Sequence, residues 1–559
     1  MKIRTTLLIL LILSVHLSNA QKWLWGSEAK VTTGYAEGYS GAIDNRRNAY
    51  IVGWYSNSIK YGTQNLTTPA EEAMDIVKYD PYGNVIWTVQ DSGYTLSDCE
   101  GQGVTTDKNG NVYATGGFSD SIKFGAITLN AYNDPNGMYD AFLVKYDSNG
   151  KVLWARQSTV SPSNSTCYAT AITVDDSGYV YIIGYSPCKT LKFGTDSLVN
   201  SSYFIVKYDS IGNVKWLKGA QGSIGGHSIA TDALNNLYVT GSFEGTCIFD
   251  TFPIYQTTGS YSTFLTKYNA QGKVEWVKDS WGENAGCSVA VSGNDIYITG
   301  SFSDASSFGS QNLPAPPYSD FFLVKYDSGG SVLWLKEATN LDVHNWTGYS
   351  VTIDMSGNIY CSIGGWNSSL VPNYEIAFGS DTLKTINNSD GDDGSSVMIM
   401  FDSLGNEICG SMVPGGGDDE SAILADPTGQ YVYLIGDLWG DTVYCGPDTL
   451  HYQYDEATFI ARWQPCNSDA GINQIASLST DVKVYPNPST GLFRMEEQGL
   501  NAGKHTIEVY NVLGEQVYSK GTNELSTVVN LEGQPTGIYF YRIVTDNISI
   551  VASGKVILK

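Results

Sequence analysis

One phrase recurs along this chain at nearly even intervals. It reads DIVKYDPYGNVIW at 75–87, DAFLVKYDSNGKVLW at 140–154 and SYFIVKYDSIGNVKW at 202–216, and similar copies stand at 262–276 and 320–334. Each copy has an apolar run, a D-x-x-G or N-x-x-G turn and a second run that ends in Trp. Because Asp caps such a turn and Gly tolerates positive φ, each copy predicts a tight antiparallel hairpin.

A second phrase alternates with the first, for example GVTTDKNGNVYATGGF at 103–118 and AITVDDSGYVYIIGY at 171–185. Degenerate copies bring each phrase to seven, so one repeat holds two hairpins, or four strands. A four-stranded sheet cannot bury both faces alone, whereas sheets stacked around an axis bury them and leave only short edges. The sequence therefore predicts an all-β fold with a seven-bladed β-propeller over 21–466.

The phase of the repeat predicts how the ring closes. Residues 21–29, QKWLWGSEA, match the outer strand of a repeat, whereas the last repeat ends after its third strand, near Trp463. We therefore expect the N-terminal strand to complete the last blade in a three-plus-one arrangement. A solenoid, the alternative to a ring, would need capped ends instead.

The repeats resemble the SBBP family of bacterial β-propeller repeats. The resemblance spans residues 21–466 and rests on the phrase KYD-x-x-G-x-V-x-W recurring in register. It implies a propeller but no single biochemical activity, because a fold alone does not determine function.

The first residues have the pattern of a secretory signal peptide. Lys2 and Arg4 precede a short apolar run, and small residues follow, which predicts a leader over 1–20 cleaved between Ala20 and Gln21. The apolar run is too short to span a bilayer, and we expect no transmembrane segment elsewhere. The formal charge of −25 disfavours nucleic acid as a partner.

The repeat pattern stops after Cys466. Residues 467–480 are small and polar, as in a linker, and short alternating strands over 481–559 predict a small Ig-like β-sandwich. An accessory sandwich with a ligand of its own is one interpretation of this segment.

The segments YPNPSTGLF (485–493), PTGIYFYRI (535–543) and GKVILK (554–559) closely resemble the type A C-terminal sorting domain of the type IX secretion system of Bacteroidetes. The resemblance implies that the type IX machinery is a partner. It also implies folding in the periplasm and delivery to the cell surface or the medium. The residues that match the family pattern are Pro486, Asn487, Pro488, Gly491, Gly537, Tyr539, Gly554 and Lys555.

Nine cysteines allow disulfides after export, with at least one left over. Cys167 and Cys188 fall at the same end of one repeat and form our predicted pair. Cys409, Cys445 and Cys466, near the ring closure, include candidates for another pair that the sequence leaves open.

No motif in the sequence predicts catalysis or a cofactor. The segment Gly226-His227-Ser228 faintly resembles a serine-hydrolase elbow, but its register in the repeat favours a structural serine. Calcium at Asp107–Asn111 is a weak alternative to a hairpin turn, because the spacing departs from that of a calcium loop. The repeated Trp residues suit packing between blades, whereas Trp366, in the long insertion 365–395, is a candidate for surface binding.

Geometry favours a binding function. The D-x-x-G hairpins point to one end of the ring and the longer connections to the other, where we expect a glycan, protein or matrix ligand to bind. A secreted polysaccharide hydrolase or lyase is the alternative, and it would need two close carboxylates in the axial pocket. A structural role in a surface layer or motility apparatus is a third hypothesis.

Overall fold

The computed structural model describes most of residues 22–559. The segments outside the description are 1–21, 94–96, 132–137, 162–165, 257–259, 341–343, 367–374, 379–380, 385–394, 415–421, 439–441, 446–447, 452–456, 467–480, 499–504, 512–515, 525 and 546–549. The chain divides into two compact units, Met1–Asn467 and Ser468–Lys559. In the described part of the chain, no helix is long and apolar enough to cross a membrane.

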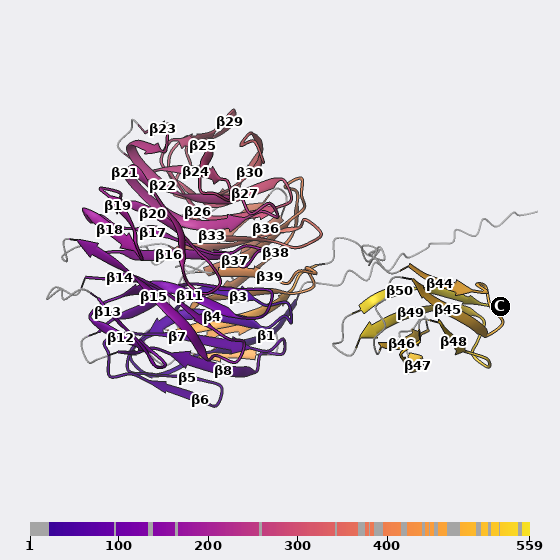
Figure 1. Ribbon diagram of the computed structural model, residues 1–559. Coiled ribbons are helices and arrows are strands. Elements are labelled where there is room, and N and C mark those ends of the chain that lie inside the picture. The colour runs from indigo at the N-terminus through magenta and orange to yellow at the C-terminus, as the bar shows by residue number, and fades with distance from the viewer. Residues whose placement is uncertain are drawn as a thin grey trace, which may run out of the picture. The chain divides into compact units, whose positions relative to one another are not determined.

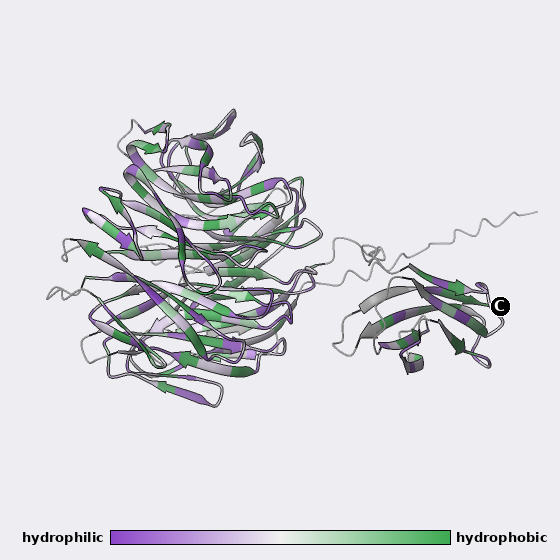
Figure 2. Ribbon diagram, viewed as in Figure 1, coloured by the Kyte–Doolittle hydropathy of each residue, from purple (hydrophilic) through white to green (hydrophobic). Residues whose placement is uncertain are grey.

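The first repeat forms a four-stranded antiparallel sheet. Its strands follow one another as β3 (Ala36–Ile43), β4 (Ala49–Tyr55), β7 (Ala73–Tyr79) and β8 (Val85–Gln90). The two middle strands are almost entirely buried, whereas the outer strand β8 is partly exposed. Hydrophobic and hydrophilic residues alternate along many strands of this unit (Figure 2), as expected for hairpins that pack in layers.

The following repeats have the same strand order. They comprise β10 (Cys99–Thr106), β11 (Val112–Phe118), β14 (Asp140–Tyr146) and β15 (Val152–Ser161); then β16 (Tyr168–Val174), β17 (Val180–Tyr185), β20 (Tyr203–Tyr208) and the first half of β21 (Val214–Thr231); then the rest of β21, β22 (Leu237–Phe249), β24 (Ser262–Tyr268) and β25 (Val274–Trp281). Next come β26 (Asn284–Ser292), β27 (Asp295–Phe302), β30 (Asp320–Asp327) and β31 (Val332–Glu337), and after them β33 (Asn345–Ile353), β34 (Ile359–Trp366), β37 (Ser395–Phe401) and β38 (Glu407–Pro414).

The inner strands form a closed circle. Strands β3, β10, β16, β21, β26 and β33 each contact the next inner strand, and β39 (Ala422–Ala425) contacts both β33 and β3. The sheets therefore surround a common axis, which is the arrangement of a β-propeller (Figure 1).

The last sheet joins the two ends of this unit. Its order is β1-β43-β40-β39, with β1 (Lys22–Glu28) antiparallel to β43 (Ala457–Gln464), which pairs in turn with β40 (Val432–Leu438). Trp25 of β1 is opposite Arg462, and its ring covers Gly83 in a turn of the first repeat. The predicted closure by the N-terminal strand is confirmed.

In three repeats, the recurring Lys and Trp of the KYD phrase donate to one carbonyl oxygen of the next repeat. Lys78 Nζ and Trp87 Nε1 both donate to the carbonyl of Ser148, at 3.2 and 3.1 Å. Lys145 with Trp154 and Lys325 with Trp334 form the same pair of bonds, to Ser210 and Ser403. The predicted position of Trp between blades is thus confirmed, and the indole also has a polar role.

The repeats contain a third, short hairpin that the sequence pattern did not predict. The connection after the second strand forms a short hairpin around a Phe-Gly or Tyr-Gly pair, such as β12 (Ser121–Phe124) and β13 (Ile127–Asn130). This hairpin pairs with the end of the preceding repeat, because β12 bonds to β9 (Ser92–Gly93), and β18 (Thr190–Phe193) bonds to β15. Where they are described, the long connections are therefore regular structure rather than variable loops.

The cysteine pairing differs from the prediction. Cys167 and Cys188 are buried free thiols. Ser158 hydrogen-bonds Cys167, and the Ser186 hydroxyl lies 2.8 Å from Cys188 Sγ. The disulfide joins Cys409 to Cys466, between β38 and the segment that follows β43. Cys409 stands where the other repeats have Trp, so a covalent bond replaces the indole contact near the ring closure.

The C-terminal unit has two antiparallel sheets around one apolar core. One sheet has β44 (Asp481–Tyr485), β45 (Leu492–Gln498) and β48 (Ser526–Asn530); the other has β47 (Gln516–Thr522), β46 (His505–Tyr510), β49 (Gly537–Thr545) and β50 (Ile550–Leu558). Phe493 and Met495 from the first sheet share the core with Ile507 and Ile543 from the second.

The first repeat departs from its neighbours at one buried position. In the second and fourth repeats, the hydroxyl of Ser158 or Ser280 accepts a hydrogen bond from the backbone N of the second residue in the third strand. In the first repeat, Asp91 takes the place of this serine and accepts the bond from Met74 N at 2.8 Å. Asp91 and Asp75 are both buried, and one oxygen of each has no hydrogen-bond partner. Burial raises the pKa of each carboxyl to about 7.

We predict that Asp91→Ser flattens the dependence of stability on pH. The folded protein retains protons on these carboxyls that the unfolded chain releases near pH 4, so its stability falls as pH rises towards 7. The substitution should increase the free energy of unfolding at pH 8 by about 2–4 kcal/mol and change it much less at pH 5. Urea unfolding at both values measures this. Ser158→Asp should have the opposite effect, and equal pH slopes for all three proteins would contradict the explanation.

We predict that Cys466→Ser destabilises the propeller unit by about 4 kcal/mol, because the bond closes a loop with a sequence separation of 57 residues. Dithiothreitol should lower the thermal midpoint of the native protein to that of the variant and leave the variant unchanged. Cys287→Ser, at a cysteine outside this disulfide, is the control. A variant that still loses stability on reduction would show that a different pair is bonded.

Candidate functional site

Three exposed aromatic residues lie at the loop end of the fourth repeat. Tyr255 ends β23 (Phe252–Tyr255), Tyr261 precedes β24 and Trp281 ends β25, and their exposed fractions are 59%, 55% and 52%. We call these three residues the aromatic patch. Large aromatic side chains are usually much more buried, so such a group points to a binding surface.

A buried polar centre holds the backbone of the aromatic patch. Asn284 donates from its backbone N to the carbonyl of Tyr261, at 3.0 Å, and from its side chain to that of Trp281, at 3.2 Å. The amide of Gln256, beside Tyr255, donates to the carbonyl of Gly282 at 3.2 Å. Gly282 has φ +101°, and a Cβ there would lie 2.3 Å from the carbonyl oxygen of Ala305, so this turn requires glycine. The three aromatics therefore share a rigid support.

A second feature is a cavity of about 800 Å³ on the propeller axis, lined by the inner strands. A β-bulge interrupts the pairing of these strands at one equivalent position. The bulged residues all line the cavity, and we call them the bulge ring: Tyr39, Gln102, Thr170, His227, Cys287 and Tyr349. Bulges occur often beside functional sites, where they redirect a side chain.

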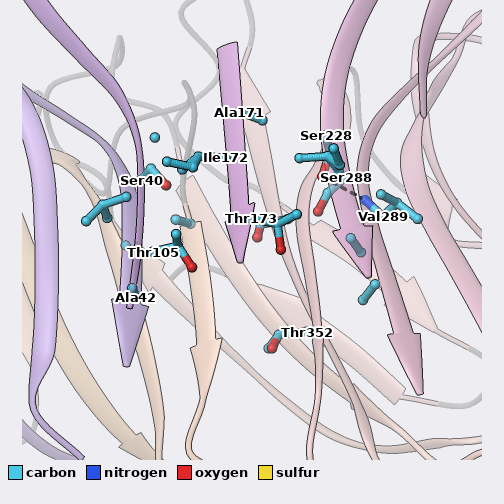
Figure 3. Close-up of a pocket in the computed structure, with 18 of the residues that line it drawn as sticks. Ser40, Ala42, Thr105, Ala171, Ile172, Thr173, Ser228, Ser288, Val289 and Thr352 are labelled. Atoms are coloured by element: carbon cyan, nitrogen blue, oxygen red, sulfur yellow. Dashed lines mark hydrogen bonds between the residues drawn. The ribbon is translucent and has the colours of Figure 1, made fainter. Parts of the chain in front are cut away.

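The position after the bulge has only small residues. Ser40, Ala171, Ser228 and Ser288 stand there and line the cavity (Figure 3). Ser228 Oγ accepts a hydrogen bond of 3.1 Å from Val289 N in the next repeat, and Ser288 accepts the equivalent bond from Val351 N. The serine of the hydrolase-like segment therefore links neighbouring inner strands.

Acidic residues lie beside two members of the bulge ring, Tyr39 and Gln102. Tyr39 donates its hydroxyl to Glu37, and Trp54 Nε1 donates to the same carboxylate at 3.2 Å. On the neighbouring strand Tyr168 donates its hydroxyl to Glu100.

Glu72 and Asp98 complete this cluster. The pKa of Glu72 is raised to about 7, first by burial and then by Glu100, Asp98 and Glu37. The pKa of Asp98 is also raised, by burial and by nearby carboxylates that include Glu100. We call Glu37, Glu72, Asp98 and Glu100 the acidic wall.

The remaining predicted sites have simpler roles. Asp107 accepts hydrogen bonds from the backbone N of Asn109 and of Asn111. Its carboxylate therefore stabilises a hairpin turn, the interpretation that the sequence favoured over a calcium site. Within the described residues, no group of three or more His, Cys, Asp and Glu side chains is placed to hold a metal ion. Trp366 is the last residue of β34, opposite Asn345, but its side chain lies outside the described residues, as do Ala20 and Gln21.

In the C-terminal unit, the PNP segment is fixed against the last strand. Asn487 donates from its side chain to the carbonyl of Lys555 at 3.0 Å and accepts from Ile557 N at 2.9 Å. The peptide bonds before Pro486 and Pro488 are both cis. The structure therefore brings together two segments that are far apart in the sequence pattern.

The other motif residues of this unit have local roles. Tyr539 is buried and donates its hydroxyl to the carbonyl of Pro535 at 2.7 Å. Gly554 lies under Tyr541, whose hydroxyl would be 2.4 Å from a Cβ at that position. Gly491 and Gly537 have positive φ values of 116° and 159°.

Two family models match this chain. Residues 483–559 match the secretion system C-terminal sorting domain, and residues 153–186 match the β-propeller repeat SBBP. The chain therefore contains an SBBP β-propeller repeat and ends in a type IX sorting domain. Its sorting domain links it to the type IX secretion machinery and supports secretion or a place on the cell surface.

The chain also resembles a curated protein and several solved structures. An uncharacterized WD repeat-containing protein of Acanthamoeba polyphaga mimivirus is 24% identical over 437 residues, which cover 71% of this chain and 28% of that protein. The chain thus spans less than a third of the length of that relative.

Among solved structures, a protein of unknown function from Dyadobacter fermentans is 8% identical, covers 80% of this chain and 99% of its own, and has a TM-score of 0.35. A fungal alcohol oxidase of the AA5 family, in complex with copper, is 12% identical, with coverages of 96% and 99% and a TM-score of 0.35. PorZ, a surface component of the type IX secretion system of Porphyromonas gingivalis, is 9% identical, with coverages of 95% and 100% and a TM-score of 0.14. At these TM-scores the likenesses carry no argument.

We predict that Asn487→Ala loosens the last strand of the sorting domain. The substitution removes both bonds to β50, at about 1 kcal/mol each or less because the site is exposed. Amide hydrogen exchange of Ile557 in the full-length protein should become about tenfold faster. Asn523→Ala, at an exposed asparagine of the same unit, should leave it unchanged. Equal exchange in both variants would show that the PNP segment does not hold the strand.

Proposed function

We propose that this protein is a non-catalytic, glycan-binding propeller that the type IX system delivers to the cell surface or the medium. The proposal includes a signal peptide cleaved after Ala20, passage through the periplasm, seven blades and an Ig-like fold for the sorting domain. The aromatic patch is the observation that carries the binding function.

The chemistry of the aromatic patch suits a carbohydrate. The apolar faces of sugar rings stack on Trp and Tyr, whose rigid rings lose little conformational entropy on binding. Exposed Glu283 lies between Trp281 and the Asn284 centre in sequence, and its carboxylate can accept hydrogen bonds from sugar hydroxyls. The patch is at the loop end of the ring, where we expected the ligand.

A neutral polysaccharide fits the electrostatics better than a polyanion. The chain has a formal charge of −25, and a strongly acidic glycan would meet repulsion over the whole surface. We therefore propose a neutral glycan as the ligand class.

We predict that Tyr261→Ala and Trp281→Ala each weaken glycan binding at least tenfold. Each substitution removes an aromatic ring on which a sugar can stack, and such a contact contributes about 1.5 kcal/mol to the binding free energy. A glycan array probed with the purified full chain identifies the ligand, and calorimetry with the best neutral oligosaccharide measures the loss. Tyr82→Ala is the matched control, since Tyr82 is 79% exposed in a D-x-x-G turn at the opposite end of the propeller.

Unchanged affinity in both patch variants would contradict the proposal. Release of new reducing ends from the bound glycan would show instead that the protein is a hydrolase.

A further inference from the structure

The bulge ring presents several kinds of polar side chain to the axial cavity. Two tyrosines, a glutamine, a threonine, a histidine and a cysteine occupy this one structural position. Each of them is at least partly exposed, whereas the residue before it is small and buried: Gly38, Gly101, Ala169, Gly226, Gly286 and Gly348. A scaffold that needs only packing would accept one residue type there in each repeat, so the variety suits contact with a ligand.

Two members of the bulge ring are held in place by the next repeat. Thr170 Oγ1 donates to the carbonyl of Gly226 at 2.7 Å, and His227 Nδ1 donates to the carbonyl of Gly286 at 2.9 Å. Because Nδ1 carries the proton, Nε2 of His227 is an acceptor. Burial lowers the pKa of His227, so its imidazole is neutral at pH 7. These side chains therefore form a neutral and preorganised surface, which lowers the entropic cost of binding.

The wall beside the bulge ring adds hydroxyl groups. Ser228 and Ser288 follow the bulge directly, and Thr105, Thr173 and Thr352 stand two residues further along their strands (Figure 3). The two serines accept hydrogen bonds from the backbone of the next repeat, and these bonds do not use the hydroxyl protons. A hydroxyl both donates and accepts, as the hydroxyls of a polyol do.

The lining of the cavity carries no formal charge at pH 7. Within the described part of the chain, none of the lining residues is Asp, Glu, Lys or Arg, although these residues make up 16% of the chain. An ionised ligand would exchange water for a site without a counter-charge, which is unfavourable. A neutral ligand with many hydroxyls instead finds both donors and acceptors there.

We propose that the axial cavity binds a neutral monosaccharide, a hexose, between the bulge ring and the hydroxyl groups of the wall. The volume of about 800 Å³ is typical of small-molecule sites and leaves room for one sugar ring. Tyr39 and Tyr349 line the cavity, and the apolar face of a sugar packs on such rings. The proposal does not rest on the aromatic patch, because Tyr255, Tyr261 and Trp281 are not among the lining residues.

Hexoses and their charged relatives test the proposal. Glucose, galactose and mannose are each compared with the corresponding uronic acid, an anion, and the corresponding amino sugar, mainly a cation. In calorimetry with the purified full chain, at least one hexose should bind with a Kd of about 1 mM or lower. Its affinity should be at least tenfold higher than that of both charged relatives, because the lining offers no counter-charge.

Two substitutions in the bulge ring test the location of the site. Gln102→Ala removes an amide from the cavity and should weaken hexose binding at least fivefold. Cys287→Trp places an indole in the cavity and should weaken it at least tenfold. The matched controls are Gln271→Ala and Leu234→Trp, which make the same kinds of change at exposed turn residues outside the cavity and should have no effect.

Three results would overturn the proposal: no binding of any of the three hexoses at about 10 mM, a concentration well above the Kd of a specific site, equal affinity for a hexose and its charged relatives, or unchanged affinity in Gln102→Ala. Near-ultraviolet circular dichroism checks the fold of each variant, and Gln102→Ala decides alone if Cys287→Trp fails to fold. Trp281→Ala should weaken polysaccharide binding and leave hexose binding intact, so failure of the aromatic patch proposal is recognised separately.

Discussion

At three of the junctions between blades, the contact depends on one shared hydrogen-bond acceptor in the turn of the following blade. A lysine and an indole from one repeat both donate to the same turn carbonyl of the next, as Lys78 and Trp87 do to Ser148. The lysine is largely buried, and Asp44 lies 3.8 Å from its Nζ, which offsets part of the desolvation that lowers its pKa. Moving the turn carbonyl out of reach would leave both donors without this partner, so at these three junctions the turn must keep its length and shape.

At the closure the chain is not continuous, and other interactions replace this pair. Arg462 stands where the other repeats have lysine; it donates to the carbonyl of Pro81 and lies over the Tyr431 ring. Trp25 comes from the first strand instead of the last, and Cys409 replaces the preceding Trp with a disulfide to Cys466. These three departures lie in or beside the last sheet, in which β1 and β43 come from opposite ends of the propeller unit.

The sequence predicted the hairpins and the closure well, because both are local patterns repeated many times. The D-x-x-G turns specify register, and the phase of Trp25 relative to the other Trp residues shows which strand is missing from the last sheet. The third hairpin was missed although Phe124-Gly125 and Phe193-Gly194 have positive-φ glycines after an aromatic residue, a pattern that could have revealed it. The predicted cysteine pair was wrong because a shared end of one blade does not fix the distance and orientation that a disulfide requires.

The candidate sites could not be predicted for a different reason. A strand pattern with period two assumes regular pairing, and a single bulge moves Gln102 or His227 to a side that the pattern assigns to its neighbour. Exposure of Trp281 depends on the turn at Gly282 and on the buried Asn284, which come from different strands. Positions that make the blade-to-blade contacts of the recurring Lys and Trp have little freedom to vary. The bulge ring and the aromatic patch lie outside these contacts, so their residues can differ between repeats.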